Sequence, residues 1–362
     1  MNPIYEIYGT DAHEMTKRLM AEAKVAAGIP SGAVIALKPN LINAERAERG
    51  STTHPEVVSG CIEYLQENGF SDISVIESSW VGEDTERSLK VCGYDKLCEK
   101  YGVAFYDLKK DKTREVDTPF RRMEISCRAL DADYLIDLPV LKGHCQTRMT
   151  CALKNLKGCI PDQEKRKYHA EGLLKPIAAL AAALKPSLVI VDSICGDLDF
   201  EEGGNPVQTN RMMLGFDAVQ MDTYCCSLMG LDLDEVPYIK LAENWGAGST
   251  EYGIIRLNEP DSSLEYPKLS GKVEALTKNV SADSACSACF AALVRALYIA
   301  SEAGIRVDED IFIGQGYQNK TLEGIGIGKC CRGADKCVMG CPPTADMIVR
   351  EFQGRADVKE II

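Results

Sequence analysis

The run Ala-Val-Ile-Ala-Leu at residues 33–37 decides the fold, because it is a short apolar segment that is followed by the start of a helix. That start is Thr-His-Pro-Glu at residues 53–56, where Thr53 can cap the helix and Pro55 suits its first turn. Gly69 can end this helix. A short buried strand followed by a helix is the repeating unit of a parallel sheet.

The same alternation continues along the chain. Apolar runs at 73–76, 104–106, 134–138 and 188–191 predict further strands, and Gly93-Tyr94 separates two short helices. Helices of about ten to fifteen residues between such strands favour an α/β fold, with a mostly parallel sheet covered by helices on both faces. We assign residues 1–265 to this α/β domain.

The boundary is predicted from the polar stretch 258–269, which contains two prolines and little apolar content. Beyond it, residues 291–300 and 344–352 favour helices, and 310–313 and 325–327 favour short strands. We therefore expect residues 266–362 to form a smaller α+β region, which is rich in cysteine.

The charge balance restricts the partners of the chain. Its 362 residues contain 41 Lys and Arg against 54 Asp and Glu, a net charge of −13, and nucleic-acid binders are typically basic. No basic leader followed by an apolar segment opens the sequence, and no apolar run reaches the about 18 residues of a membrane helix. We expect a cytoplasmic protein that binds neither nucleic acid nor membranes.

Cysteine is the most informative residue type. Sixteen cysteines in 362 residues are too sparse for a disulfide scaffold, so a reducing cytoplasm with buried or metal-binding cysteines is expected. Six of them lie in the last quarter of the chain: Cys286, Cys289, Cys330, Cys331, Cys337 and Cys341.

Four of these six are the predicted ligands of one 4Fe–4S cluster. Cys286 and Cys289 form a CxxC pair, a spacing that turns two thiolates toward one centre. Cys341 is followed by Pro342, as the last ligand is in ferredoxin runs. Cys330 is the fourth candidate because it directly follows a Gly-rich strand.

Other interpretations of this region stay open. Adjacent cysteines in an extended segment point to opposite sides, so Cys330 and Cys331 are not expected to bind together, and Cys331 or Cys337 could replace Cys330. A zinc site with four thiolates is the main rival, although zinc ribbons usually have two CxxC pairs. A redox dithiol or inert buried cysteines would also be compatible with the sequence.

Polar residues gather after the predicted strands of the large domain. Parallel sheets place their ligands at the carboxyl ends of the strands, and lysines there suggest a pocket for a small anion. We predict His54, His144 and Lys154 as catalytic residues, with a histidine as proton donor. The predicted substrate-binding residues are Lys38, Asn40, Lys142, Asn155, Lys157 and Asp192. Each could instead form a turn, a helix cap or a structural pair.

The large domain resembles the uncharacterised conserved family called domain of unknown function 362. The segments that carry the resemblance are 38–41, 52–56, 138–144, 150–158 and 191–192, so it extends over most of residues 35–230. Several members of that family carry an iron–sulfur region at one end. The resemblance therefore implies that the C-terminal cysteines of this chain form such a region. The resemblance implies no particular reaction, and Cys331 and Cys337 depart from the common pattern as extra candidates.

The function expected from the sequence is that of an iron–sulfur protein with redox activity. It would either relay electrons to a partner protein or reduce a small anionic substrate. Two alternatives belong to other classes: a non-redox enzyme in which an iron without a cysteine ligand acts as a Lewis acid, and a zinc-stabilised binding module without catalysis.

Overall fold

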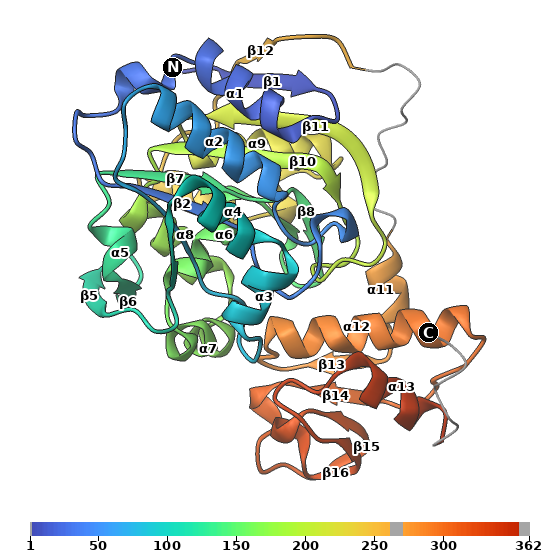
Figure 1. The fold of residues 1–362 in the computed structure, drawn as a ribbon. Helices are drawn as coiled ribbons and strands as arrows, with labels where there is room; N and C mark the ends of the chain where they lie inside the picture. The colour runs from blue at the N-terminus through green and yellow to red at the C-terminus, as the bar shows by residue number, and fades with distance from the viewer. Residues whose placement is uncertain (1, 261–270, 355–362) are drawn as a thin grey trace. The chain divides into compact units, whose positions relative to one another are not determined.

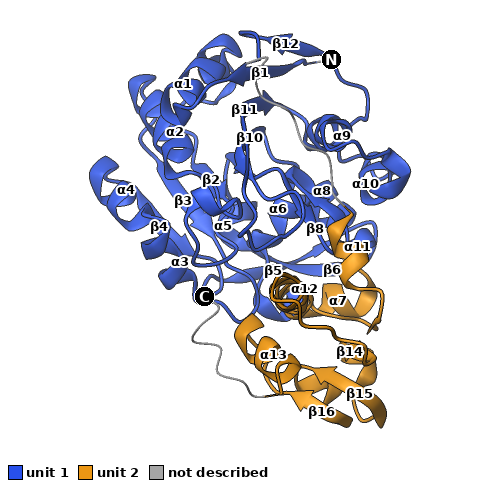
Figure 2. Cartoon of the chain, turned by 90° about the vertical axis from the view of Figure 1, so that its right-hand side faces the viewer, with its two compact units in different colours: residues 1–165, 174–269 blue, residues 166–173, 270–362 orange. Residues whose placement is uncertain are grey.

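The computed structural model describes residues 2–260 and 271–354. The chain divides into two compact units, unit 1 with residues 1–165 and 174–269, and unit 2 with residues 166–173 and 270–362 (Figure 2). The domain boundary expected at residue 265 lies in 261–270, outside the described residues. None of the described helices is long and apolar enough to cross a membrane.

Unit 1 is built on a sheet of eight strands in the described part of the chain (Figure 1). Their order is β12-β1-β11-β10-β7-β2-β3-β4, and β11 alone runs against its two neighbours. The predicted mostly parallel α/β fold is confirmed. The strands are β1 (Ile4–Tyr8), β2 (Ile35–Pro39), β3 (Ile73–Glu77), β4 (Ala104–Asp107), β7 (Tyr134–Leu138), β10 (Leu188–Gly196), β11 (Val207–Gly215) and β12 (Ile254–Arg256).

Two sets of helices pack against this sheet. Helices α1 to α4 pack against one another, as do α6, α8, α9 and α10, and Figure 2 shows the two sets on opposite sides of the sheet. Their apolar faces meet strands that are buried along their length, such as β2, β7 and β10. The helices of this unit are α1 (Ala12–Glu22), α2 (Pro55–Glu67), α3 (Thr85–Val91), α4 (Tyr94–Tyr101), α5 (Cys127–Leu130), α6 (Ala152–Asn155), α8 (Leu174–Leu184), α9 (Ala218–Leu228) and α10 (Tyr238–Asn244).

The glycines predicted to end or separate helices do so, but the predicted helix cap at Thr53 is wrong. Gly69 and Gly93 both adopt left-handed backbone conformations, one just after α2 and the other between α3 and α4, as predicted. Thr53, however, does not cap α2, which has His54 at its N-cap position. The Thr53 hydroxyl instead accepts the Asn40 amide and donates to the Leu138 carbonyl, so it joins the ends of β2 and β7.

Two hairpins complete unit 1, and one helix runs across the division between the units. The hairpins are β5 (Thr113–Asp117) with β6 (Arg122–Ser126), and β8 (Lys142–His144) with β9 (Arg148–Thr150). The remaining helix is α7 (Asp162–Glu171).

Unit 2 contains a second sheet whose four described strands are all parallel. Its order follows the chain: β13 (Val280–Ala282), β14 (Ile311–Ile313), β15 (Leu322–Ile327) and β16 (Ala334–Val338). Helices α11 (Lys272–Leu276), α12 (Ser287–Glu302) and α13 (Ala345–Phe352) accompany it, and α12 packs against α13. Because the strands are parallel, their carboxyl ends all meet at one edge of this sheet.

Candidate functional site

The four predicted cluster ligands gather at the carboxyl edge of the small sheet. Cys286 follows β13 and occupies the N-cap position of α12, and Cys289 lies in the first turn of that helix. Cys330 follows β15, and Cys341 follows β16. Three strands and one helix start therefore each bring a thiol to the same edge.

The sulfur atoms are close enough to act on one another. Burial raises the pKa of the Cys289 thiol well above its ordinary value, and the neighbouring Cys286, Cys341, Cys330 and Cys331 raise it further. Cys286, Cys289 and Cys330 are half-buried, and Cys341 is exposed. Four thiols with one member at the surface fit the donor set of an iron–sulfur cluster.

The two reserve cysteines lie differently. Cys331 is buried, with its Sγ 3.9 Å from the Gly314 carbonyl oxygen. Cys337 is half-buried within β16, with its Sγ 3.6 Å from the Gly328 carbonyl oxygen. Gly326 has no room for a side chain because a Cβ there would lie 2.5 Å from the Cys331 carbonyl oxygen. Gly326 thus allows the turn 329–331 to pack closely on β15.

The strand that lacks a cysteine contributes two glutamines, which sequence reasoning missed. Gln315 and Gln318 follow β14 at the same edge of the sheet. The Nε2 of Gln315 donates to the Cys286 Sγ, and the Nε2 of Gln318 donates to the Cys330 Sγ, both over 3.6 Å. Both sulfurs are predicted ligands, and hydrogen bonds to sulfur influence the reduction potential of iron–sulfur clusters.

The geometry differs from that of a site for one ion. Within residues 2–260 and 271–354, no three His, Cys, Asp or Glu side chains are grouped so that they could hold a metal ion. A cubane binds each thiolate to a different iron, so its four sulfurs stand further apart than the ligands of a single zinc.

In unit 1, the predicted polar residues are brought together around the ends of β2 and β7. Lys38 and Asp137 lie opposite each other in the register of these strands. The Lys38 Nζ donates to the Glu77 Oε2 over 2.7 Å, and both side chains are buried. The Asn155 Nδ2 donates to the Asp137 Oδ1 over 2.8 Å, and the Asn155 Oδ1 accepts from the Asn40 Nδ2 over 2.9 Å.

A second buried group surrounds Glu201. The Lys154 Nζ lies 2.5 Å from the Glu201 Oε1, and the His144 Nε2 lies 2.8 Å from the Oε2. The His144 Nδ1 accepts the backbone amides of Gln146 and Thr147, so the ring proton is on Nε2, facing Glu201. Burial lowers the pKa of His144 to about 4, so the ring is neutral at neutral pH.

Burial also shifts the pKa values of other ionisable groups in these two buried networks. It raises the pKa of Asp137 to about 8, although Lys38 and Asn155 oppose that shift. It lowers the pKa of Lys142 to about 7, and the Lys142 Nζ donates to the Ser51 carbonyl. Burial opposes the charge of Glu201, but His144 and Lys154 hold the pKa of its carboxyl well below the usual range.

These contacts change the interpretation of the lysines. Lys38, Lys142 and Lys154 are buried and already donate to protein oxygens, so they do not form an open anion pocket. Lys157 is half-buried on the turn that follows α6. Two of the acidic residues in these networks could have been suspected from the sequence. Asp137 interrupts an apolar run, and Glu77 ends a predicted strand. Glu201 lies in an irregular loop, and nothing in the local pattern marks it.

His54, a predicted catalytic residue, lines a cavity. Its Nδ1 lies 2.7 Å from the Asp192 Oδ2, which also accepts the His54 backbone amide. Burial disfavours the charged ring, but Asp192 and the nearby Glu56 and Glu48 together raise the pKa of His54 to about 9. The ring is therefore protonated at neutral pH, with Asp192 as its counterion.

The cavity has a volume of about 480 Å³ and lies at the carboxyl edge of the large sheet. Asp11, Glu48 and Glu56 line it together with His54 and Cys195. Three carboxylates against one imidazolium do not favour the anionic ligand that the lysines suggested.

A comparison with known protein families agrees with the resemblance. The family described as domain of unknown function (DUF362) matches residues 35–227. The thylakoid-associated protein sll1697 of Synechocystis sp. is 28% identical over 238 residues, which cover 61% of this chain and 71% of that protein. The lactate racemase apoprotein of Thermoanaerobacterium thermosaccharolyticum has a TM-score of 0.44 and 12% identity over 63% of this chain, and the match covers 57% of the racemase, less than two thirds of its length.

Proposed function

Because the chain belongs to the family described as domain of unknown function 362, whose description names no reaction, we propose a function from the site itself. The protein is an iron–sulfur protein that transfers electrons through one 4Fe–4S cluster. Its ligands are Cys286, Cys289, Cys330 and Cys341. The observation that carries the proposal is the convergence of these four thiols at the carboxyl edge of one parallel sheet.

The donor set supports redox chemistry over Lewis-acid chemistry. A cluster with four cysteine ligands leaves no iron open to a substrate, and it supplies one-electron transfer. The four cysteines bind it from three strand ends and one helix start, which are rigid elements. Cys341 is exposed, so a cluster held there would be accessible to a redox partner protein. We propose a reducing cytoplasm as the location of the protein, because free thiols persist there.

The test is to purify or reconstitute the full chain without oxygen, and to measure iron, sulfide and zinc together with visible and paramagnetic-resonance spectra. We expect about four iron and four sulfide per chain, a brown chromophore and reversible reduction by dithionite. A colourless protein with one tightly held zinc would overturn the proposal. An oxidised cluster whose spectrum shifts directly on adding small anions would favour the Lewis-acid alternative.

Variants then identify the ligands. Cys286→Ser, Cys289→Ser, Cys330→Ser and Cys341→Ser should each lose or convert the cluster. Cys331→Ser and Cys337→Ser are matched controls in the same unit, and Cys127→Ser is a half-buried control in unit 1. Retention of the cluster by Cys330→Ser, with its loss in Cys337→Ser, would replace Cys330 by Cys337 in the ligand set.

A second candidate within the same class is reduction of a small molecule at the cavity of unit 1, and the His54–Asp192 pair favours it. A histidine that is protonated at neutral pH can deliver a proton as electrons arrive. The cavity charge favours a neutral or cationic substrate over an anionic one. Reduction of a carbonyl compound to an alcohol takes two electrons and two protons, so the one-electron cluster must be reduced again within each turnover. With excess dithionite as the electron source, His54→Gln should slow the protein-dependent reduction of small carbonyl compounds, and His13→Gln should not.

A further inference from the structure

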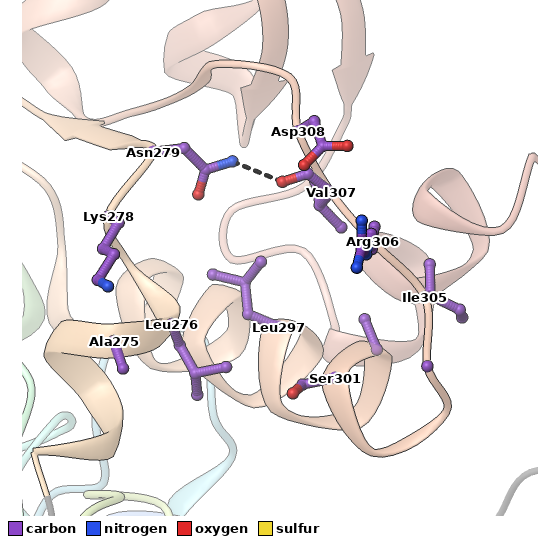
Figure 3. Close-up of a pocket in the computed structure, with 12 residues that line it drawn as sticks. Ala275, Leu276, Lys278, Asn279, Leu297, Ser301, Ile305, Arg306, Val307 and Asp308 are labelled. Atoms are coloured by element: carbon purple, nitrogen blue, oxygen red, sulfur yellow. Dashed lines mark hydrogen bonds between the residues drawn. The ribbon is translucent and has the colours of Figure 1, made fainter.

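A second cavity lies in unit 2, at the opposite edge of the small sheet from the cysteines. Its volume is about 550 Å³, within the range of sites for small organic molecules. Figure 3 shows the residues that line it. Lys278 and Asn279 precede β13, and Val307 and Asp308 precede β14, so the cavity lies at the amino ends of these strands. The last turns of α12 form its floor.

The cavity combines an apolar floor with two cations. Leu276 from α11 and Leu297 from α12 contribute apolar surface, together with Val307 (Figure 3). Lys278 and Arg306 stand on opposite sides of it, and both are exposed. In the described part of the chain, neither of these two side chains has a hydrogen bond or ion pair. Each is therefore available to a ligand.

The wall that carries Arg306 is held in place before any ligand binds. The Asn279 Nδ2 donates to the Val307 carbonyl over 2.9 Å and to the Glu309 carbonyl over 2.7 Å. These bonds fasten the segment before β14 to the segment before β13. A preformed wall reduces the entropy that a ligand loses in ordering the protein.

We propose that this cavity binds a small organic monocarboxylate with a short apolar chain. The carboxylate lies between Lys278 and Arg306, and the chain covers Leu276, Leu297 and Val307. Two cations face a single lining carboxylate, Asp308, in a protein whose net charge is −13, so the cavity is locally suited to an anion. The apolar floor selects against small hydrophilic anions such as phosphate. None of the lining residues is a cysteine, so the ligand would contact none of the predicted cluster ligands.

The experiment is a calorimetric titration of the full chain with octanoate, hexanoate, octanol and octylamine. Octanoate should bind more tightly than hexanoate by several-fold, because each buried methylene contributes up to about 0.8 kcal/mol. Octanol and octylamine should bind at least about tenfold more weakly than octanoate. Binding should weaken as salt rises, since Lys278 and Arg306 are exposed.

Two single variants locate the carboxylate. Lys278→Gln and Arg306→Gln should each weaken octanoate about threefold or more, as expected for an exposed ion pair. Arg350→Gln removes an exposed cation from α13 outside the cavity and should bind as the unchanged protein does. The proposal is wrong if octanoate fails to bind at millimolar concentration, if octylamine binds as well, or if Arg350→Gln weakens binding as much as Arg306→Gln.

Discussion

At the scale of single residues, the buried charges of unit 1 depend on their partners. Lys38 is fully buried, and its ammonium donates to Glu77 and to the Pro39 carbonyl. Removing one member of a buried pair leaves the other charge desolvated, which costs about 3–5 kcal/mol. The Lys38 side chain is fully buried and packs against Gly158, where a Cβ would lie 2.7 Å from the Lys38 Cε, so its charge has no contact with water.

Glu77→Gln should therefore lower the free energy of unfolding by about 3 kcal/mol in urea titrations. Glu86→Gln is the matched control, because Glu86 pairs with Lys90 on an exposed helix face and should change stability by at most about 0.5 kcal/mol. Equal effects of the two substitutions would show that the Lys38–Glu77 pair contributes no more than a surface pair.

The His54–Asp192 pair predicts a defined pH dependence. The pKa of His54 is raised to about 9 in the folded protein and is about 6.5 in the unfolded chain. Protonation therefore stabilises the fold fully below about pH 6.5, and this contribution disappears as the pH rises through 9.

Asp192→Asn should return the pKa of His54 toward 6.5, measured by NMR of the imidazole and assigned with His54→Gln. The stability difference between the two proteins should be about 2 kcal/mol larger at pH 6 than at pH 10. Asp192 also accepts two backbone amides, so a further loss independent of pH is expected. An unchanged imidazole titration would remove Asp192 as the cause.

The two glutamines at the cysteine site predict a change in reduction potential. An N–H donor stabilises the more negative, reduced form of a cluster, so its removal makes reduction harder. Gln315→Leu and Gln318→Leu should each shift the potential to more negative values in a spectroscopic redox titration, with iron and sulfide content unchanged. Gln353→Leu, near the end of α13, is the control. A positive shift would contradict the assigned donors.

At the scale of elements, the sequence predicts what depends on local pattern. The runs at 33–37, 73–76, 134–138 and 188–191 correspond to β2, β3, β7 and β10, because buried parallel strands are apolar throughout. In unit 2, β13 and β16 were missed. β13 has only three residues, and β16 reads Ala-Asp-Lys-Cys-Val, so neither has a strand pattern that stands out from its surroundings.

The candidate site in unit 1 was likewise predictable only in part. The rule that parallel strands end at one edge correctly brought Lys38, Asn40 and Asp192 to the same end of the sheet. The rule does not predict that Lys154 and His144 contact Glu201. Glu201 lies about fifty residues further along the chain, in an irregular loop. The sequence does not distinguish a lysine that is free to bind a ligand from one that is paired with a buried carboxylate.

The packing of β8 against that loop gives an element-scale prediction. A Cβ on Gly143 would lie 1.9 Å from the Leu198 carbonyl oxygen, so an alanine must displace the loop that carries Glu201. Gly143→Ala should lower the free energy of unfolding by about 2–3 kcal/mol in urea titrations. Gly28→Ala, where a Cβ would meet nothing within 4 Å, should leave stability within about 0.5 kcal/mol.

At the scale of the whole molecule, the two units differ in how they are stabilised. Unit 1 has an eight-stranded sheet with helices on both faces and a large continuous core. Unit 2 has short strands of three to six residues, and its cysteines come from three strand ends and one helix start. A cluster that joins these ends would contribute its binding free energy directly to the folding of unit 2.

Loss of the cluster should therefore loosen unit 2 selectively. In hydrogen-exchange mass spectrometry, Cys286→Ser should lose protection in β13, β15, β16 and α12, because the predicted ligands follow these strands or lie at the start of this helix. β14 should lose protection with them, because it pairs with β13 and β15. The amides of β2, β7 and β10 should exchange as in the unchanged protein, since their core contains no ligand. Cys127→Ser should alter neither unit. If protection fell equally in both sheets, the cluster would stabilise the chain as one cooperative body, and the division into two units would not describe its unfolding.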